Sequence, residues 1–291
     1  MSANPLNQLL ATLNVQANVF HNGQYCGAWK IDTSGSSLMN FHIVTHGECL
    51  IEVESQRFHL NAGDAVFMPN DAKHTITSLL DSDTKPNQAS SLPMIEERLE
   101  DATGLVCGHF THKHPVFNRL LTQLPSIIII RQNEDTFANA IIELILIESK
   151  NSGQNTNFLL NRLSDSLFYI LLRDKLSTQA GILAASSHPK LSAPIEFIHN
   201  NIEQPLRVEM LANLAGMSRS AFSSLFKETT QLTPAEYVTQ WRMTKAYRWL
   251  SDDKISTLDA AVRCGYESEA SFSKAFKRII GIGPGEARKI S

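Results

Sequence analysis

The sequence predicts an α+β chain with more than one domain. A small antiparallel β-barrel comes first, a helical segment follows, and the C-terminal domain is all-α. Three observations lead to this prediction: short apolar–polar alternations between Leu38 and His74, apolar residues at helical spacing between Thr136 and Leu176, and one two-helix unit that occurs twice, at Gly216–Pro234 and Gly265–Pro284. A chain of 291 residues has room for two ordinary domains.

Composition excludes several classes of protein. Apolar residues make up 43% and charged residues 19%, so a folded chain is expected. The longest apolar cluster, Ile141–Ile147, is far too short to span a membrane, and the first residues lack the basic and apolar regions of a secretory signal. Four dispersed cysteines do not form a secreted disulfide framework. We therefore expect a soluble, cytoplasmic protein with no membrane partner.

Charge is distributed unevenly along the chain. The formal net charge is −3, but residues 190–291 carry 14 Lys+Arg against 11 Asp+Glu, whereas residues 1–189 carry 12 against 18. The basic excess therefore coincides with the repeated unit, where an acidic partner such as nucleic acid would bind.

The predicted barrel rests on closely spaced short strands. The runs "FHIV", "CLIEVE", "RFHL" and "AVFMP" are each followed by Gly, Asn, Asp or Ser residues that favour turns. A polar stretch, Asp81–Asp101, is expected to be an exposed loop, and a further strand is expected at Gly104–His112.

Two helices are predicted next, at Thr136–Ser149 and Asn157–Leu176. The second carries a leucine stripe, and its members are Leu160, Leu163, Leu167 and Leu171. This stripe either packs on the barrel or forms a dimer seam between two copies of the chain. Residues 177–189 are rich in small side chains and are expected to be a linker.

The first copy of the repeated unit predicts two helices joined by a tight turn. A short helix, Val208–Gly216, ends at a glycine, and Ser218 is placed to cap the next helix. Phe222 and Phe226 lie on the buried face of that second helix, which leaves a small, polar outer face. This is the arrangement of a helix-turn-helix, whose second helix enters the major groove of DNA.

The second copy repeats the pattern in register. Ser268, Phe272 and Phe276 match the cap and the two phenylalanines, and Cys264 is expected in the core. Between the copies, Ala235–Asp253 is expected to form one helix of roughly 24 Å at about 1.5 Å per residue. A rod of this length can hold two helices in successive major grooves, about 34 Å apart.

These stretches carry a resemblance to a known family. "AGMSRSAFSSLFKETTQLTPAEYVTQWRM" and "GYESEASFSKAFKRIIGIGPGEAR" resemble the signature of the AraC/XylS family of bacterial transcription regulators. "GDAVFMPNDAKH" resembles the second motif of the cupin superfamily, with Asp71 where many cupins have Gly. The usual first-motif HxH pair is missing, although Asn40 and His42 fall on the face where ligands bind. The resemblance implies a cupin sensor in 1–125, a helical dimerisation segment in 126–178, and a DNA-binding domain in 190–291.

The resemblance also implies which residues contact double-stranded DNA. The base contacts would be Arg219, Ser220, Ser223 and Ser224 in the first unit, and Glu269, Ala270, Ser273 and Lys274 in the second. The phosphate contacts would be Arg242, Lys245 and Lys277. Two of these have alternative interpretations, because Arg219 can be a solvated charge and Glu269 can favour its own helix N-terminus electrostatically.

Three interpretations of the sensor stay open. In the first, Cys26, His42, His74 and Cys107 bind a metal, for which zinc is the candidate. In the second, Cys26 and Cys107 form a thiol switch, as some members of this branch resemble oxidant sensors. In the third, the cysteines are buried packing residues and the barrel binds an organic effector.

The sequence therefore predicts a homodimeric, sequence-specific DNA-binding regulator that is not an enzyme and that contacts RNA polymerase if it activates. One alternative is a cupin metalloenzyme with a DNA-binding tail, which turnover with added iron or manganese would reveal. Another is a protein-interaction module, which would lack the steep salt dependence of DNA binding.

Overall fold

The computed structural model describes residues 15–80, 91–94, 101–112, 124–132, 134, 136–151, 157–176 and 181–290. The chain divides into two compact units, and in its described part the first comprises Val15–His112 with Leu124–Leu171 and the second begins at Leu172. The first is β-rich and the second is helical, which confirms the predicted α+β class. Within the described ranges, no helix has the length and apolar character needed to cross a membrane.

The first unit contains two antiparallel sheets. The six-stranded sheet has the order β10-β6-β3-β9-β1-β8, formed by β10 (Ile128–Ile130), β6 (Ala65–Met68), β3 (Met39–His46), β9 (Thr103–His112), β1 (Val15–Tyr25) and β8 (Ser91–Pro93). The four-stranded sheet has the order β2-β7-β4-β5, formed by β2 (Lys30–Ile31), β7 (His74–Thr77), β4 (Glu48–Val53) and β5 (Gln56–Asn61).

The predicted strands between Leu38 and His74 and at Gly104–His112 are therefore present. The predicted loop Asp81–Asp101 lies mostly outside the described residues, and its described part includes the short strand β8. The longest strand, β1, was not predicted, because its Asn, Gln and Gly residues weaken the β signal.

The core of this unit lies between the sheets, where residues from both contribute to one apolar cluster that includes Trp29, Ile51, Leu60 and Leu105. All eight residues of β3 are buried, because its other face is also covered. On that face Phe41 stacks with Phe67 and Phe110 of the neighbouring strands. Side chains of β3 therefore alternate between two dry layers, and its inward residues Asn40 and His42 enter the space between the sheets.

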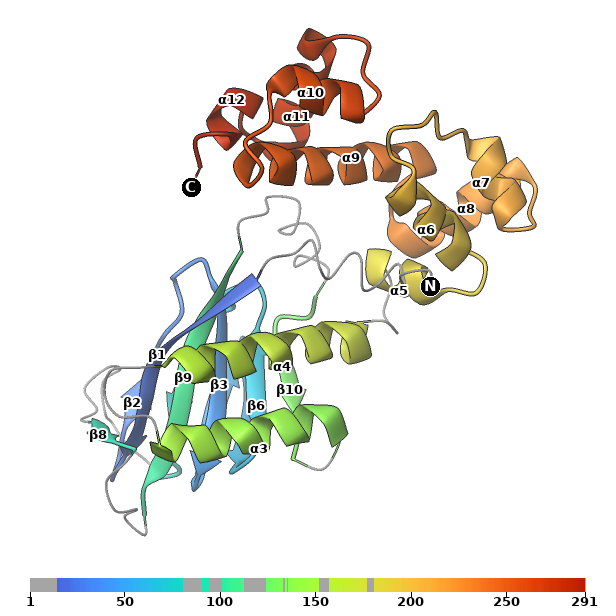
Figure 1. Ribbon diagram of the computed structural model, residues 1–291. Helices are drawn as coiled ribbons and strands as arrows, with labels where there is room; N and C mark the ends of the chain where they lie inside the picture. Colours follow the sequence, from blue (N-terminus) through green and yellow to red (C-terminus); the bar gives the residue numbers. More distant parts are fainter. Residues whose placement is uncertain are drawn as a thin grey trace. The chain divides into compact units, whose positions relative to one another are not determined.

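Helices α3 (Thr136–Asn151) and α4 (Phe158–Leu176) lie side by side across the outer face of the six-stranded sheet (Figure 1). Phe168 of α4 packs on Phe110 with ring centroids 4.6 Å apart. Asp165 and Asn161 accept hydrogen bonds from backbone N–H groups of β1.

The predicted leucine stripe of α4 faces this sheet, and its members Leu160, Leu167 and Leu171 are buried. The interpretation that the stripe packs on the barrel is therefore confirmed for these three residues.

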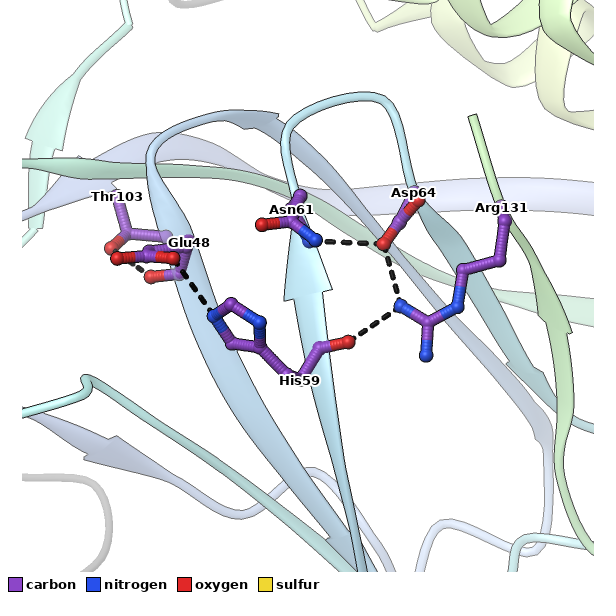
Figure 2. Close-up of polar contacts among 6 residues, drawn as sticks. All are labelled: Glu48, His59, Asn61, Asp64, Thr103 and Arg131. Atoms are coloured by element: carbon purple, nitrogen blue, oxygen red, sulfur yellow. Dashed lines mark hydrogen bonds and ion pairs between the residues drawn. The ribbon is translucent and has the colours of Figure 1, made fainter. Parts of the chain in front are cut away.

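A polar cluster ties β10 to the turn between β5 and β6 (Figure 2). The buried carboxylate of Asp64 accepts hydrogen bonds from the backbone N–H groups of Asn61 and Gln132, at 3.0 and 2.9 Å. Arg131, directly after β10, places Nη1 2.7 Å from Asp64 Oδ2 and also donates to the His59 carbonyl. This ion pair holds the edge strand that leads into α3.

The second unit is built from α5 (Ile182–Ser187), α6 (Ser192–Asn200), α7 (Val208–Leu214), α8 (Arg219–Thr230), α9 (Pro234–Ser251), α10 (Thr257–Arg263), α11 (Glu269–Ile280) and α12 (Pro284–Ala287). The pairs α7–α8 and α10–α11 are the two predicted helix-turn-helix units, and the single helix α9 connects them (Figure 1). Residues 177–180 of the predicted linker lie outside the described residues, and much of its remainder is the short helix α5.

Candidate nucleic-acid interface and sensor centre

Helices α8 and α11 begin in the same way. Ser218 accepts a hydrogen bond from the Ala221 N–H, and Ser268 accepts one from the Ser271 N–H. Each cap follows a turn at a glycine with positive φ, Gly216 at 62° and Gly265 at 72°. A left-handed conformation at these positions favours glycine, so the turns are encoded locally.

The two helices also bury equivalent faces. Phe222 and Phe226 of α8 are buried, as are Phe272 and Phe276 of α11, and the sequence of buried and exposed positions is the same along both helices. Of the predicted base-contact residues, Ser223 and Ser273 are partly buried and the other six are exposed, namely Arg219, Ser220, Ser224, Glu269, Ala270 and Lys274. The structure thus groups the predicted residues on one outer face of each helix.

Arg219 is engaged in a surface ion pair. Its Nη1 lies 3.0 Å from Glu209 Oε1 of α7, and both side chains are largely exposed. A pair of this kind contributes little to stability because water screens it. The guanidinium can therefore exchange Glu209 for a DNA acceptor at small cost.

The predicted phosphate contacts lie in three different environments. Lys277 is exposed on α11. Lys245 lies over the Trp241 ring, 5.1 Å from its centroid. Burial lowers the pKa of Lys245, and the positive charge of the neighbouring Arg248 lowers it further. Arg242 is partly buried and donates hydrogen bonds to two backbone carbonyls.

Helix α9 is fixed at its start by a complete capping box. Thr233 accepts from the Glu236 N–H, and Glu236 accepts from the Thr233 N–H at 2.8 Å. The box was predicted from "TPAE", and the helix runs to Ser251 without a break, as expected. Both helix-turn-helix units pack against this rod.

In the first unit, two histidines meet between the sheets. His42 comes from β3 and His74 from β7, and their Nε2 atoms are 3.1 Å apart. The hydroxyl of Thr33, in the loop after β2, lies 3.3 Å from His42 Nε2 and 2.8 Å from His74 Nε2. Both histidines are among the candidate metal ligands named from the sequence, and both are buried.

Hydrogen bonds assign the protonation of this pair. Burial lowers the pKa of His42, and the neighbouring His74 and His21 lower it further. Burial also lowers the pKa of His74, against the opposing effects of the Ala72 carbonyl and of Asp32 and Asp71. His74 Nδ1 lies 2.7 Å from the Ala72 carbonyl, which only accepts, so this nitrogen carries the proton and Nε2 presents a lone pair.

His42 must then donate from Nε2 to reach His74. Its Nδ1 is buried and has no hydrogen-bond partner among the described residues. A buried ring nitrogen without a partner is costly, and a histidine that donates Nδ1–H to a carbonyl is the usual form of a metal ligand. His74 therefore has the tautomer of a metal ligand, whereas His42, which donates from Nε2 here, would have to carry its proton on Nδ1 before its Nε2 could bind a metal.

The two cysteines of the predicted site, Cys26 and Cys107, differ in their exposure to solvent. Cys107 is buried and pairs across the sheet with His42, and burial raises the pKa of its thiol, with Cys49 adding to the effect. Cys26 is exposed directly after β1. Within the ranges described above, no group of three or more His, Cys, Asp or Glu side chains is arranged to hold a metal.

Three residues near this centre were missed from the sequence. His21 of β1 pairs with Cys107 from the opposite side to His42, and burial lowers its pKa to about 4. Cys49 is buried in the same core, and burial raises its pKa to about 12. Thr33 lies in a loop that carries no periodic signal, so only the fold reveals it. The pairing of His21 would have followed had β1 been predicted.

Two equivalent helix-turn-helix units, joined in one chain to a domain of two antiparallel sheets, define the architecture of a DNA-binding protein with a second, separate domain. Comparison with known families agrees. Residues 4–177 match the family model described as "Cupin", and residues 211–290 match the one described as "Helix-turn-helix domain". The chain belongs to the AraC family of transcription regulators, in the group with an N-terminal cupin domain.

Relatives match along nearly the whole chain. An "uncharacterized HTH-type transcriptional regulator" of Haemophilus influenzae is 27% identical, over 98% of both chains. The "RCS-specific HTH-type transcriptional activator RclR" of Escherichia coli is 26% identical, over 98% of this chain and 96% of its own. A solved AraC-type regulator from Chromobacterium violaceum is 31% identical over 36% of this chain and 93% of its own, with a TM-score of 0.34. The protein is a DNA-binding transcription regulator with a cupin sensing domain.

Proposed function

We propose that this regulator recognises its DNA site with both α8 and α11, placed in successive major grooves. The observation that supports this most strongly is the equivalence of the two helices, which share caps, buried phenylalanines and polar outer faces. The base contacts are Arg219, Ser220, Ser223 and Ser224 of α8, with Glu269, Ala270, Ser273 and Lys274 of α11. Lys277, exposed beside them, contacts phosphate.

The experiment measures affinity for a duplex that the full-length protein selects from a random-sequence library, between 50 and 200 mM salt. Lys274→Ala should change the preferred base at one position and cost roughly 5- to 150-fold in affinity there. Lys277→Ala should weaken binding to all sequences alike and reduce the salt slope by about 0.9. Lys190→Ala, an exposed lysine before α6, is the matched control.

Affinity that is insensitive to salt would refute DNA binding and favour a protein-interaction module. If Lys277→Ala affected one sequence only, Lys277 would be a base contact instead. Turnover of a substrate by the protein loaded with iron or manganese would instead favour the cupin enzyme.

We propose further that the barrel senses its signal at His42 and His74. Two nitrogens bound tetrahedrally to one zinc ion at 2.0–2.1 Å lie about 3.3 Å apart, close to the 3.1 Å between these atoms. Zinc would hold the two rings together and connect the sheets. A thiol signal at Cys26 and Cys107 and an organic effector are the competing hypotheses.

Bound metal and free thiols should be measured in protein purified without chelator, before and after mild oxidant. The metal hypothesis predicts stoichiometric zinc that His74→Ala abolishes. Cys26→Ala should also lower the zinc content if the exposed thiol is a ligand, and leave it unchanged if it is not. Loss of the Cys26 and Cys107 thiols without zinc would favour the thiol switch. Absence of metal together with four unreactive thiols would refute both and leave an organic effector.

The partner that we propose for α3 is a second copy of the chain. Its outward residues Phe137, Leu144 and Ile147 are 66%, 48% and 57% exposed, and with the exposed Ala140 they follow the a and d positions of a heptad. In an antiparallel pair, Glu143 of one copy lies on the same flank as Lys150 of the other, which gives two complementary charge contacts.

Sedimentation equilibrium of the full-length protein tests this dimer. Leu144→Glu should raise the dissociation constant at least tenfold, because it places like charges together at the centre of the seam. Leu159→Glu, at an exposed leucine of α4, should leave the constant unchanged. Equal dissociation constants for Leu144→Glu and the wild type would show that α3 does not form the dimer contact.

We propose a cytoplasmic, non-enzymatic regulator, and the activator named among its relatives suggests contact with RNA polymerase.

A further inference from the structure

Arg242, near the middle of α9, contacts both helix-turn-helix units. Its side chain donates to the loop that precedes α7, with Nε 2.8 Å from the Ile202 carbonyl and Nη2 2.7 Å from the Gln204 carbonyl. Its own backbone carbonyl accepts from the thiol of Cys264, at the end of α10, at 3.5 Å. One residue therefore bonds to the first helix-turn-helix unit through its side chain and to the second helix-turn-helix unit through its backbone.

The two units also approach each other around this guanidinium. A Cβ atom on Gly265, in the turn between α10 and α11, would lie 3.5 Å from Arg242 Nη2 and 3.5 Å from the carbonyl oxygen of Glu203. A side chain at position 265 would therefore touch both groups, so the turn of the second helix-turn-helix unit lies beside the loop of the first. Burial raises the pKa of the adjacent Cys264 to about 12, and the Arg242 charge partly offsets this.

A guanidinium suits this position for two reasons. The carbonyls of Ile202 and Gln204 lie in the loop after α6, which ends at Asn200, so the hydrogen bonds of a helix do not satisfy them and a side-chain donor can. The planar fork of arginine reaches two carbonyls at once in fixed directions, which a lysine ammonium cannot do.

The second helix-turn-helix unit has a similar contact. Arg288 Nε donates to the Lys254 carbonyl, at 3.0 Å, in the loop before α10. Arg242 differs in that its helix is shared by both units.

We propose that Arg242 is a positioning residue for DNA recognition: it fixes the separation and rotation of α8 relative to α11. This inference rests on the proposed function, in which both helices enter DNA. It gives Arg242 a different role from the phosphate contact expected from the sequence, since two of its three side-chain nitrogens are already bonded to carbonyls.

The test compares two duplexes. The first is recovered by the wild-type, full-length protein from a random 40-base-pair library. The second carries one extra base pair between the two recognised segments, which shifts one groove by about 3.4 Å and about 35°. The wild type should prefer the first duplex by about 30-fold or more, since misplacing one helix costs at least as much as a mismatched base pair.

Arg242→Gln and Arg242→Lys should reduce this preference to about fivefold or less, with the salt slope unchanged. A phosphate contact would behave differently: Arg242→Gln would lower the slope by about 0.9, affect both duplexes alike, and be rescued by Lys. A purely structural role would lower the folded fraction and affinity for both duplexes equally, leaving the ratio intact. Arg248→Gln, at an exposed arginine of the same helix, is the control.

An unchanged ratio in both Arg242 variants overturns the inference. If the wild type itself binds without salt dependence, the proposed function fails. If the wild type binds but tolerates the inserted base pair, DNA binding stands and a fixed spacing between α8 and α11 is refuted.

Discussion

Replacement of Asp64 by alanine should destabilise the first unit by about 3–5 kcal/mol. The side chain of Asp64 is 3% exposed, and its carboxylate accepts from two backbone N–H groups and from Arg131. Each orphaned backbone donor costs at least about 1 kcal/mol, and a charge-assisted bond contributes about 1.5–3 kcal/mol. Arg131→Ala should cost only about 1–2 kcal/mol, because Arg131 is 32% exposed and Asp64 keeps both backbone donors.

Native-state hydrogen exchange of the full-length protein measures this difference where it occurs. Peptides that cover β5, β6 and β10 report the free energy of opening of this edge, whereas peptides from α8 and α11 serve as an internal control. The double variant should be less destabilised than the sum of the two single variants, by about 1–2 kcal/mol. A cost for Arg131→Ala equal to that of Asp64→Ala would refute the reasoning, since it would mean that the backbone donors contribute nothing.

Three further predictions concern the second unit. Burial, and secondarily Lys245, lowers the pKa of His199 to about 3, so the unfolded chain binds a proton first as the pH falls. The free energy of unfolding should therefore decrease by about 1.4 kcal/mol per pH unit below about 6.5, and urea titrations of His199→Gln should show a shallower dependence. Phe272→Ala removes a fully buried ring and should cost about 3–5 kcal/mol in the same titration. Ser268→Ala should cost about 1 kcal/mol, and exchange in the first turn of α11 should accelerate; unchanged exchange there would count against the cap.

Local signals predicted the helical half of the molecule well. Caps, glycine turns and buried phenylalanines act within a few residues, so "GMSRSAF" and "GYESEASF" encode their turns and helices directly. The role of Arg242 could not be predicted in this way, because its carbonyl partners lie about 40 residues earlier in the chain. From the sequence alone, an arginine on the helix between the two predicted DNA-contacting helices is interpreted as a phosphate contact.

The sensor centre was predicted in part. The resemblance to cupins made His42 and His74 candidate ligands of the barrel, and the structure brings their ring nitrogens together. Whether Cys26 joins a shared site stays a prediction, and it is exposed in this structure. Thr33 was missed because a loop residue has no periodicity, and its contact with both histidines depends on how β2 and β3 are joined.

If both helix-turn-helix units enter DNA as proposed, the continuous helix α9 makes each chain a bivalent ligand for DNA. Once one helix-turn-helix unit is in its groove, the other is confined to a small volume around the next groove, at an effective concentration far above that of free protein. Weak binding by either unit can then add up to tight binding by the pair, and release requires both to dissociate before either rebinds. A single chain can therefore remain on its site for longer than its contacts in any one groove would allow.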